Sequence, residues 1–226
     1  MSTGFDGGGL GATSMRRRNR RGEGQRLKSD IVDAASTLVE ETGGEEAVTL
    51  RAVARKVGIA APSIYPHFAD RRAVLVAVKE QLCRSLTLAL EEATPEGIDP
   101  VAGLHAGCAA YLRFASEHPA LYQALFGETG LSSLDCSWPE GHGPAADPRS
   151  VRWTGVAACD VLVVAIRRCV DAGRSASTAP FDDAVGLWMA LHGMATLTAN
   201  TVNFPWPDPD ELMGHLVDRL ARIVRR

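Results

Sequence analysis

Apolar residues recur at steps of three and four along most of the chain, a spacing that predicts amphipathic α-helices. The first such pattern starts at Arg26 and is stopped by Gly43-Gly44, which gives one helix with a single apolar face. Its apolar positions are Leu27, Ile31, Ala34, Ala35, Leu38 and Val39. No β-type alternation of apolar and polar residues occurs up to residue 90, so this region is expected to be entirely helical.

Capping residues divide the next forty residues into three further helices. Thr49 suits the N-cap of a short helix that Gly58 ends in a left-handed conformation. Pro62 suits the first turn of a third helix that extends to Phe68, and Asp70 can cap a longer fourth helix. The apolar positions of these helices are Leu50, Val53, Ala54, Val57, Ile64, Phe68, Val74, Leu75, Val78, Leu82 and Leu86.

A second set of helices is expected after Pro95 and Pro100. They are placed at residues 100–117, 119–126, 150–172, 181–202 and 208–224. Segments 156–170 and 184–198 are apolar nearly all round, which indicates burial on more than one side. Residues 127–149 show no periodicity, and loops of this length are usually functional or disordered.

Composition places the chain among globular proteins. It has 226 residues, of which 46% are hydrophobic and 23% charged. No run of 18 apolar residues and no apolar N-terminal stretch is present, so a cytoplasmic location is expected. The five cysteines are odd in number and lack CxxC spacing, which favours reduced thiols over disulfides or a zinc site.

The net charge of -3 argues against a protein that binds nucleic acid through bulk positive charge. The charge is unevenly distributed, however. Residues 16–85 hold fourteen Lys and Arg against nine carboxylates, a net of +5, which leaves -8 for the remainder. Chance clustering is one reading, and a basic module joined to an acidic one is the other.

Three segments follow from this organisation. Residues 1–24 contain seven Gly and the run Arg16 to Arg21, with Met15 as another possible start of translation, and are expected to form a disordered basic arm. The arm either reaches a DNA minor groove or is a solvated tail. Residues 25–70 are expected to form a helix-turn-helix domain, and residues 71–226 a larger helical domain that begins with a connecting helix at 70–90.

Residues 49–68 have the layout of a helix-turn-helix, two short helices around a Gly-containing turn. Small residues at the start of the second helix let its backbone approach a groove, and polar side chains on its surface can donate hydrogen bonds to bases. Arginines at either end can meet phosphates. The residues expected to bind DNA are Thr49, Arg51, Ala60, Ala61, Ser63, Tyr65, His67 and Arg71.

This block resembles the tetracycline-repressor (TetR) family of bacterial transcriptional regulators. The resemblance covers residues 27–82, with Thr49-Leu-Arg-Ala-Val-Ala, Val57-Gly-Ile and Ile64-Tyr-Pro-His-Phe as its core. It implies an all-α, two-fold symmetric homodimer that binds a palindromic DNA operator and releases it when a small molecule occupies the C-terminal domain. Pro66 departs from the family pattern, because it removes an N–H near the end of the recognition helix.

The C-terminal half resembles the Trp-His-Gly type of regulatory domain found in part of that family, through Trp188, His192 and Gly193. The resemblance implies that the helices at 181–202 and 208–224 pack against their symmetry mates. Aromatic and polar residues of this half either line an effector pocket or belong to the core. The pocket candidates are His105, Cys108, Tyr111, Phe114, Tyr122, Phe126, Trp153, Trp188, Met189 and His192.

Other chemistry finds little support in the sequence. His105 and Cys108 have the spacing of two metal ligands, but no third ligand follows, so no metal and no cofactor are expected. Nucleotide-binding and hydrolase motifs are lacking, which argues against an enzyme. A helical protein-interaction adaptor remains the alternative to a DNA-binding repressor released by a hydrophobic effector.

Overall fold

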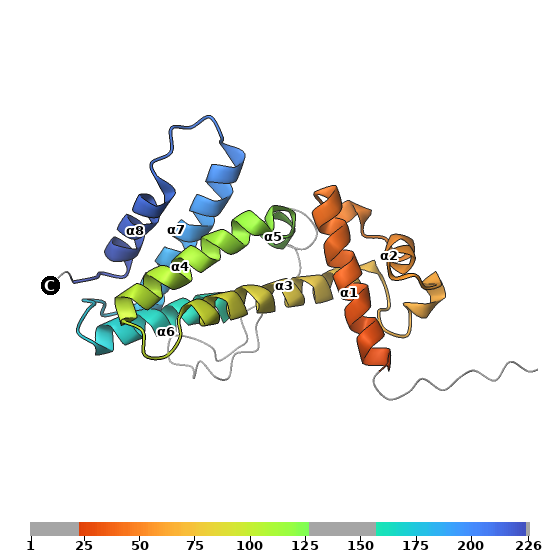
Figure 1. Ribbon diagram of the computed structural model, residues 1–226, viewed down its shortest axis with the longest axis horizontal. Helices are drawn as coiled ribbons and strands as arrows, with labels where there is room; N and C mark the ends of the chain where they lie inside the picture. Colours follow the sequence, from red (N-terminus) through yellow and green to blue (C-terminus); the bar gives the residue numbers. More distant parts are fainter. Residues whose placement is uncertain (1–22, 127–156, 225–226) are drawn as a thin grey trace, which may run out of the picture.

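The computed structural model describes residues 23–126 and 157–224, and these residues fold into helices (Figure 1). Within these two ranges the β-structure is limited to one isolated bridge between Ser175 and Ile223. The elements are α1 (Glu23–Thr42), η1 (Glu45–Ala47), α2 (Leu50–Val57), η2 (Ala61–Ser63), α3 (Arg71–Ala93), α4 (Pro100–Glu117), α5 (Pro119–Phe126), α6 (Ala157–Asp171), α7 (Pro180–Asn200) and α8 (Pro209–Leu220). The all-α fold class is therefore confirmed.

Capping residues set where helices α2 and α3 begin and where α2 ends, as the sequence predicts. The Thr49 hydroxyl accepts a hydrogen bond from the Ala52 amide at 3.1 Å, and the Asp70 carboxylate accepts one from the Ala73 amide at 2.8 Å. Gly58 follows α2 with φ of 78°, a left-handed conformation that costs glycine little. These caps satisfy backbone groups that a helix end leaves without partners.

The predicted helix at 62–68 is the main difference from the sequence-based expectation. The structure has a single 3₁₀ turn, η2, followed by non-helical turns in which the His67 and Phe68 amides donate to the Ile64 carbonyl. Pro62 and Pro66 have no N–H to donate, and each proline disfavours helical geometry in the residue before it. Two prolines four residues apart thus prevent a regular α-helix.

Helix α3 connects the two halves of the molecule, as Figure 1 shows. Near its start, the buried Val74, Leu75 and Val78 belong to the side of the core formed with α1. Its second half contributes Leu86 and Leu90 to a core shared with α4 and α6. One continuous helix therefore belongs to both cores.

Most helix boundaries in the C-terminal half agree with the expectation. The helices predicted at 100–117 and 119–126 are α4 and α5, while α7 and α8 end before the predicted residues 202 and 224. Beyond α8, Arg222 adopts a φ of 52°. Ile223 then pairs with Ser175, a contact that a continuing helix would prevent. At the other end, α1 already begins at Glu23, inside the predicted arm.

Three predictions concern residues outside the described ranges: the segment at 127–149 lies wholly outside them, and the arm at 1–24 and the helix at 150–172 lie partly outside. Four cysteines within the described ranges are buried free thiols. No helix among these residues is both long and apolar enough to cross a bilayer.

Candidate DNA-binding surface and regulatory cluster

The turn at residues 60–68 separates buried apolar side chains from exposed polar ones. Ile64 and Phe68 are 0% and 4% exposed and anchor the segment in the core. Between them, Tyr65 is 59% exposed, and Ser63 is exposed as well. A large aromatic side chain with a hydroxyl thus projects outward from a turn that two buried residues anchor.

The other predicted DNA-contact residues surround this turn. Arg51 in the first turn of α2 and Ala60 before η2 are exposed, whereas Ala61 and His67 are half-buried. A side chain at Gly24 would approach the His67 ring, which places His67 beside the start of α1. Thr49 is exposed, but its hydroxyl already caps α2. Most of these predicted contact residues are therefore accessible from outside, and their contact with DNA stays a prediction.

Arg71 is held by the protein itself. Its Nε donates to the Val48 carbonyl at 2.7 Å, and one terminal nitrogen donates to the Glu45 carbonyl at 2.6 Å. The side chain is half-buried, and it ties the start of α3 to the segment that precedes α2. Phosphate contact by Arg71 stays a prediction, and the observed bonds give this residue a structural use that the sequence did not indicate.

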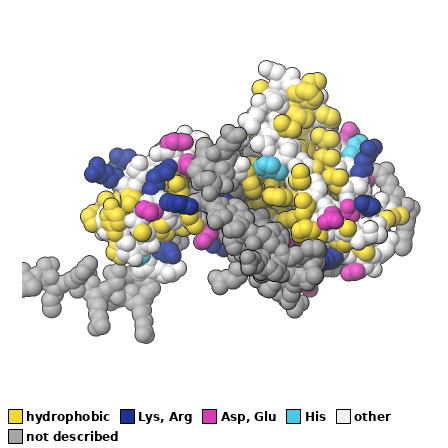
Figure 2. Space-filling view, turned by 180° about the vertical axis from the view of Figure 1, so that it is seen from behind, with side chains coloured by type: hydrophobic (Ala, Val, Ile, Leu, Met, Phe, Trp, Pro, Cys, Tyr) yellow, Lys and Arg dark blue, Asp and Glu magenta, His cyan; other side chains and the backbone are white. Residues whose placement is uncertain are grey.

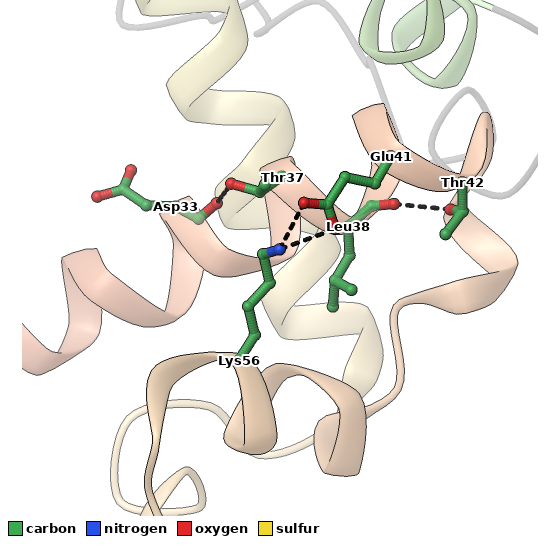
Figure 3. Close-up of polar contacts among 6 residues, drawn as sticks. All are labelled: Asp33, Thr37, Leu38, Glu41, Thr42 and Lys56. Atoms are coloured by element: carbon green, nitrogen blue, oxygen red, sulfur yellow. Dashed lines mark hydrogen bonds and ion pairs between the residues drawn. The ribbon is translucent and has the colours of Figure 1, made fainter.

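A second polar contact fixes α2 against α1. In Figure 3, Lys56 of α2 reaches Glu41 of α1, and its ammonium donates to both carboxylate oxygens at 2.8 Å. On α1 itself, Thr37 and Thr42 donate to the carbonyls of Asp33 and Leu38, four residues earlier. The Lys56 charge is therefore paired at the α1–α2 contact. Arg51 and Arg55 of the same helix are exposed as well.

Five of the predicted pocket residues form a cluster between α4, α5 and α7, here called the aromatic cluster: Tyr111, Tyr122, Phe126, Trp188 and His192. The Phe126 ring lies 4.9 Å from both the Tyr122 and His192 rings. The Tyr122 hydroxyl bonds the Tyr111 hydroxyl at 2.8 Å and His192 Nδ1 at 2.7 Å. Residues from three helices thus combine apolar rings with a polar centre.

The remaining pocket candidates take no part in the ring contacts of the aromatic cluster or lie outside the described residues. His105 faces α8, where its Nε2 lies 3.1 Å from Asp218. Phe114 packs on His118, Cys108 is fully buried, and Met189 is 65% exposed. Burial raises the pKa of the Cys108 thiol to about 12, so it is protonated and a poor metal ligand. Trp153 is not among the described residues.

A cavity of about 440 Å³ opens at the other end of the regulatory half. The connection between α3 and α4 and the last turns of α6 form its walls, with Ile98, Leu104 and Arg168 among the lining residues. None of the predicted pocket residues lines it. Within the described ranges, no group of three or more metal-ligating side chains is present.

One face of α7 is apolar and uncovered. Met189 and Leu197 are 65% and 52% exposed, and side chains built at Gly186 and Gly193 would meet no atom within 4 Å. These residues follow one another at helical spacing, on the side of α7 opposite the buried Leu187 and Leu191. Figure 2 shows hydrophobic side chains over the protruding α7–α8 part and basic ones on the α1–α2 lobe.

The two halves also meet away from α3. His118, which ends α4, places its Nδ1 3.1 Å from a carboxylate oxygen of Glu40 on α1. The next helix, α5, packs against α1 and carries Tyr122 and Phe126 of the aromatic cluster. A short path therefore leads from α1 through α5 to His192.

Two family models match separate parts of the chain. Residues 31–78 match the model for bacterial regulatory proteins of the tetR family, and residues 104–220 match that for the tetracyclin repressor-like C-terminal domain. The chain belongs to the TetR family. A TetR-family protein is a DNA-binding transcription regulator, and the family is not an enzyme family. The Trp-His-Gly subset implied by Trp188, His192 and Gly193 is not confirmed.

Individual relatives extend over nearly the whole chain. A Mycobacterium tuberculosis protein described as an uncharacterized HTH-type transcriptional regulator, Rv0681, is 27% identical, with 88% of this chain and 82% of that protein covered. A Rhodococcus sp. RHA1 protein of unknown function has a TM-score of 0.67 at 26% identity, over 92% and 97% of the chains. SmeT, the repressor of the Stenotrophomonas maltophilia multidrug efflux pump SmeDEF, shares the fold, with a TM-score of 0.60 and 20% identity over 89% and 92% of the chains.

Proposed function

We propose that this regulator is a cytoplasmic repressor that binds a palindromic operator as a homodimer and leaves it when a hydrophobic effector binds. The observation that carries DNA reading is the projection of Tyr65 from a turn anchored by Ile64 and Phe68. Ser63 and the small residues Ala60 and Ala61 let this turn approach base edges. Arg51 and the open N–H groups at the start of α2 supply phosphate contacts.

Binding to an operator selected from random duplex DNA, followed by fluorescence anisotropy, tests this assignment. Tyr65→Ala should weaken operator binding at least tenfold, while Phe204→Ala, which removes a similarly exposed ring from the regulatory half, should leave affinity unchanged. Affinity should also fall steeply with salt, because phosphate contacts release counterions. Equal affinity of the Tyr65→Ala variant and the parent protein would contradict this role of the turn.

The uncovered face of α7 supports a dimer interface with a second copy of the chain. Gly186 and Gly193 leave open space that lets a partner helix approach closely, and Met189 and Leu197 supply apolar area around them. In the proposed dimer, α7 and α8 of each copy form a four-helix bundle across the two-fold axis. The bundle would hold the turns at residues 60–68 of the two copies in successive major grooves.

Sedimentation of charged variants tests the interface. Leu197→Glu should shift the protein toward monomer at micromolar concentration, because a carboxylate would be buried against the partner's apolar face. Leu88→Glu on α3, at a residue with comparable exposure, should remain dimeric. Dimers of unchanged stability in both variants would place the interface elsewhere.

The aromatic cluster supports the effector site. An apolar molecule bound between α4, α5 and α7 would displace α5 against α1 and tilt α3. This tilt would alter the distance between the turns at residues 60–68 of the two copies. Only a difference in effector affinity between the two arrangements is needed for this switch. A cognate effector that left operator affinity unchanged would rule it out.

A further inference from the structure

The polar centre of the aromatic cluster is a continuous chain of hydrogen bonds. Tyr111 on α4 bonds Tyr122 on α5 at 2.8 Å between hydroxyl oxygens, and Tyr122 bonds Nδ1 of His192 on α7 at 2.7 Å. Tyr111 and Tyr122 are 0% and 3% exposed. Next to this chain, the indole N–H of Trp188 is buried and acts as a donor toward the Tyr111 hydroxyl, where it lowers the pKa of Tyr111 against the larger effect of burial. Buried donors of this kind need acceptors, so the direction of each proton is constrained.

Both phenols keep their protons, and the imidazole is neutral. Burial raises the pKa of Tyr111 and of Tyr122, and it lowers the pKa of His192. Two O–H protons and one imidazole proton must therefore be distributed along three groups. A neutral imidazole has one nitrogen that donates and one that accepts.

Only one distribution gives each phenol proton an acceptor within the described residues. If Tyr111 donates to Tyr122 and Tyr122 donates to Nδ1, both phenol protons are bonded. In the reverse direction Nδ1–H donates to Tyr122 and Tyr122 to Tyr111, and the buried Tyr111 hydroxyl then has no acceptor in the described structure. An unmade bond from a buried donor is costly, so the first arrangement is preferred. His192 consequently carries its proton on Nε2.

The Nε2–H group of His192 is therefore an oriented donor beside aromatic rings. The imidazole is half-buried, and no acceptor for Nε2 is recorded in the part of the chain that the structure describes. The Phe126 and Tyr122 rings lie 4.9 Å and 5.7 Å from the imidazole ring. On α7, His192 lies between the buried side and the outward stripe of Gly186 and Gly193. One fixed donor among apolar surfaces is typical of a small-molecule site.

We propose that the effector is an apolar or aromatic molecule with a carbonyl-type oxygen, which accepts a hydrogen bond from Nε2 of His192. This inference rests on the proposed function, since it takes the aromatic cluster as the effector site. Tyr122 and Tyr111 are positioning residues, because they fix the imidazole tautomer without touching the ligand oxygen. Molecules that present only a donor, such as an ammonium group, are rejected because two donors would face each other.

Three probes with the same ring system test this preference by calorimetry on the full-length dimer. They are 2-acetylnaphthalene with a carbonyl oxygen, 2-ethylnaphthalene with no polar atom, and 2-naphthylmethylamine with a cationic donor. The ketone should bind about 5- to 10-fold more tightly than the hydrocarbon, the ratio expected from one neutral hydrogen bond. The amine should bind no more tightly than the hydrocarbon.

Two variants locate the preference in the hydrogen-bond chain. His192→Phe should bind the ketone and the hydrocarbon equally, whereas His215→Phe, at an exposed histidine of α8, should keep the parent ratio. Tyr122→Phe should reduce the ratio, because Nδ1 loses its donor and the imidazole proton is no longer confined to Nε2. Nitrogen-15 chemical shifts of His192 in the unmodified protein should show the Nε2–H tautomer, a readout that does not depend on any variant folding.

Equal affinity for all three probes, tighter binding of the amine, absence of binding by every probe, or an Nδ1–H tautomer would each overturn the inference. Operator binding is measured separately on the same samples. Loss of operator binding with the ketone preference intact would reject the DNA-binding role and keep the ligand site. Loss of the ketone preference with operator binding intact would reject the ligand class and keep the DNA-binding role.

Discussion

Arg71 links two segments of the N-terminal domain through hydrogen bonds to backbone carbonyls, and its removal should destabilise the protein. The guanidinium donates to Val48 and Glu45 at 2.7 and 2.6 Å. A hydrogen bond from a charged group contributes about 1.5–3 kcal/mol. Since Arg71 is half-buried and water can reach part of the site, a combined loss of about 2–4 kcal/mol is expected for Arg71→Ala.

Scanning calorimetry measures this loss. For a chain of this length each kcal/mol lowers the melting temperature by about 2–4 °C, so Arg71→Ala should melt on the order of 10 °C below the parent protein. Arg71→Lys should lie between the two, because a lysine ammonium lacks the planar fork that reaches both carbonyls. Arg72→Ala, at the exposed neighbour, is the matched control and should change the melting temperature by less than about 2 °C.

The opposite pattern would refute the structural role. If Arg71→Ala melted within about 2 °C of Arg72→Ala and still lost operator binding, the guanidinium would act mainly on DNA phosphate, as its position after Phe68 first suggested. A parallel loss of stability and affinity is expected, because Arg71 positions the segment before α2 and the start of α3.

Other perturbations have equally definite outcomes. Asp70→Ala should cost about 1 kcal/mol in urea unfolding, since the Ala73 amide loses its cap, and an unchanged midpoint would contradict the cap. Burial lowers the pKa of His192 from 6.5, so below that pH the unfolded chain binds more protons than the folded chain. The free energy of unfolding should therefore fall from pH 7.5 to 5.5, and it should fall less steeply in His192→Phe. Glu40→Gln should weaken effector-induced release from the operator more than Glu41→Gln does. Glu40 contacts His118 of the regulatory half, whereas Glu41 pairs with Lys56 inside the N-terminal domain. Equal effects of the two substitutions would argue against coupling through the Glu40–His118 contact.

Short-range signals account for the parts of the fold that the sequence predicted well. Thr49, Gly58 and Asp70 determine helix ends through their own side chains and backbone preferences, so both limits of α2 and the start of α3 needed no tertiary information. The same local chemistry explains why the helix expected at residues 62–68 is shortened to a turn. Pro66 indicated a distortion, but the combined effect of Pro62 and Pro66 reached further, and a 3₁₀ turn replaced the expected helix.

Long-range contacts account for the parts that the sequence did not reveal. Arg71 bonds residues 23 and 26 positions earlier, and His118 meets Glu40 across 78 positions. No local periodicity encodes such pairs. Helical spacing alone indicates the pocket candidates, and it cannot separate Tyr122 and His192, which bond each other across 70 positions, from the outward-facing Met189.

Selection of bound sequences from a random duplex DNA library tests the central claim most directly. A dimer that presents two turns carrying Tyr65 should enrich a palindrome whose half-sites lie about one helical turn, or a multiple of it, apart. Tyr65→Ala should lose this enrichment while it remains folded and dimeric. Failure of the unmodified protein to enrich any sequence, or enrichment of one without two-fold symmetry, would contradict the account.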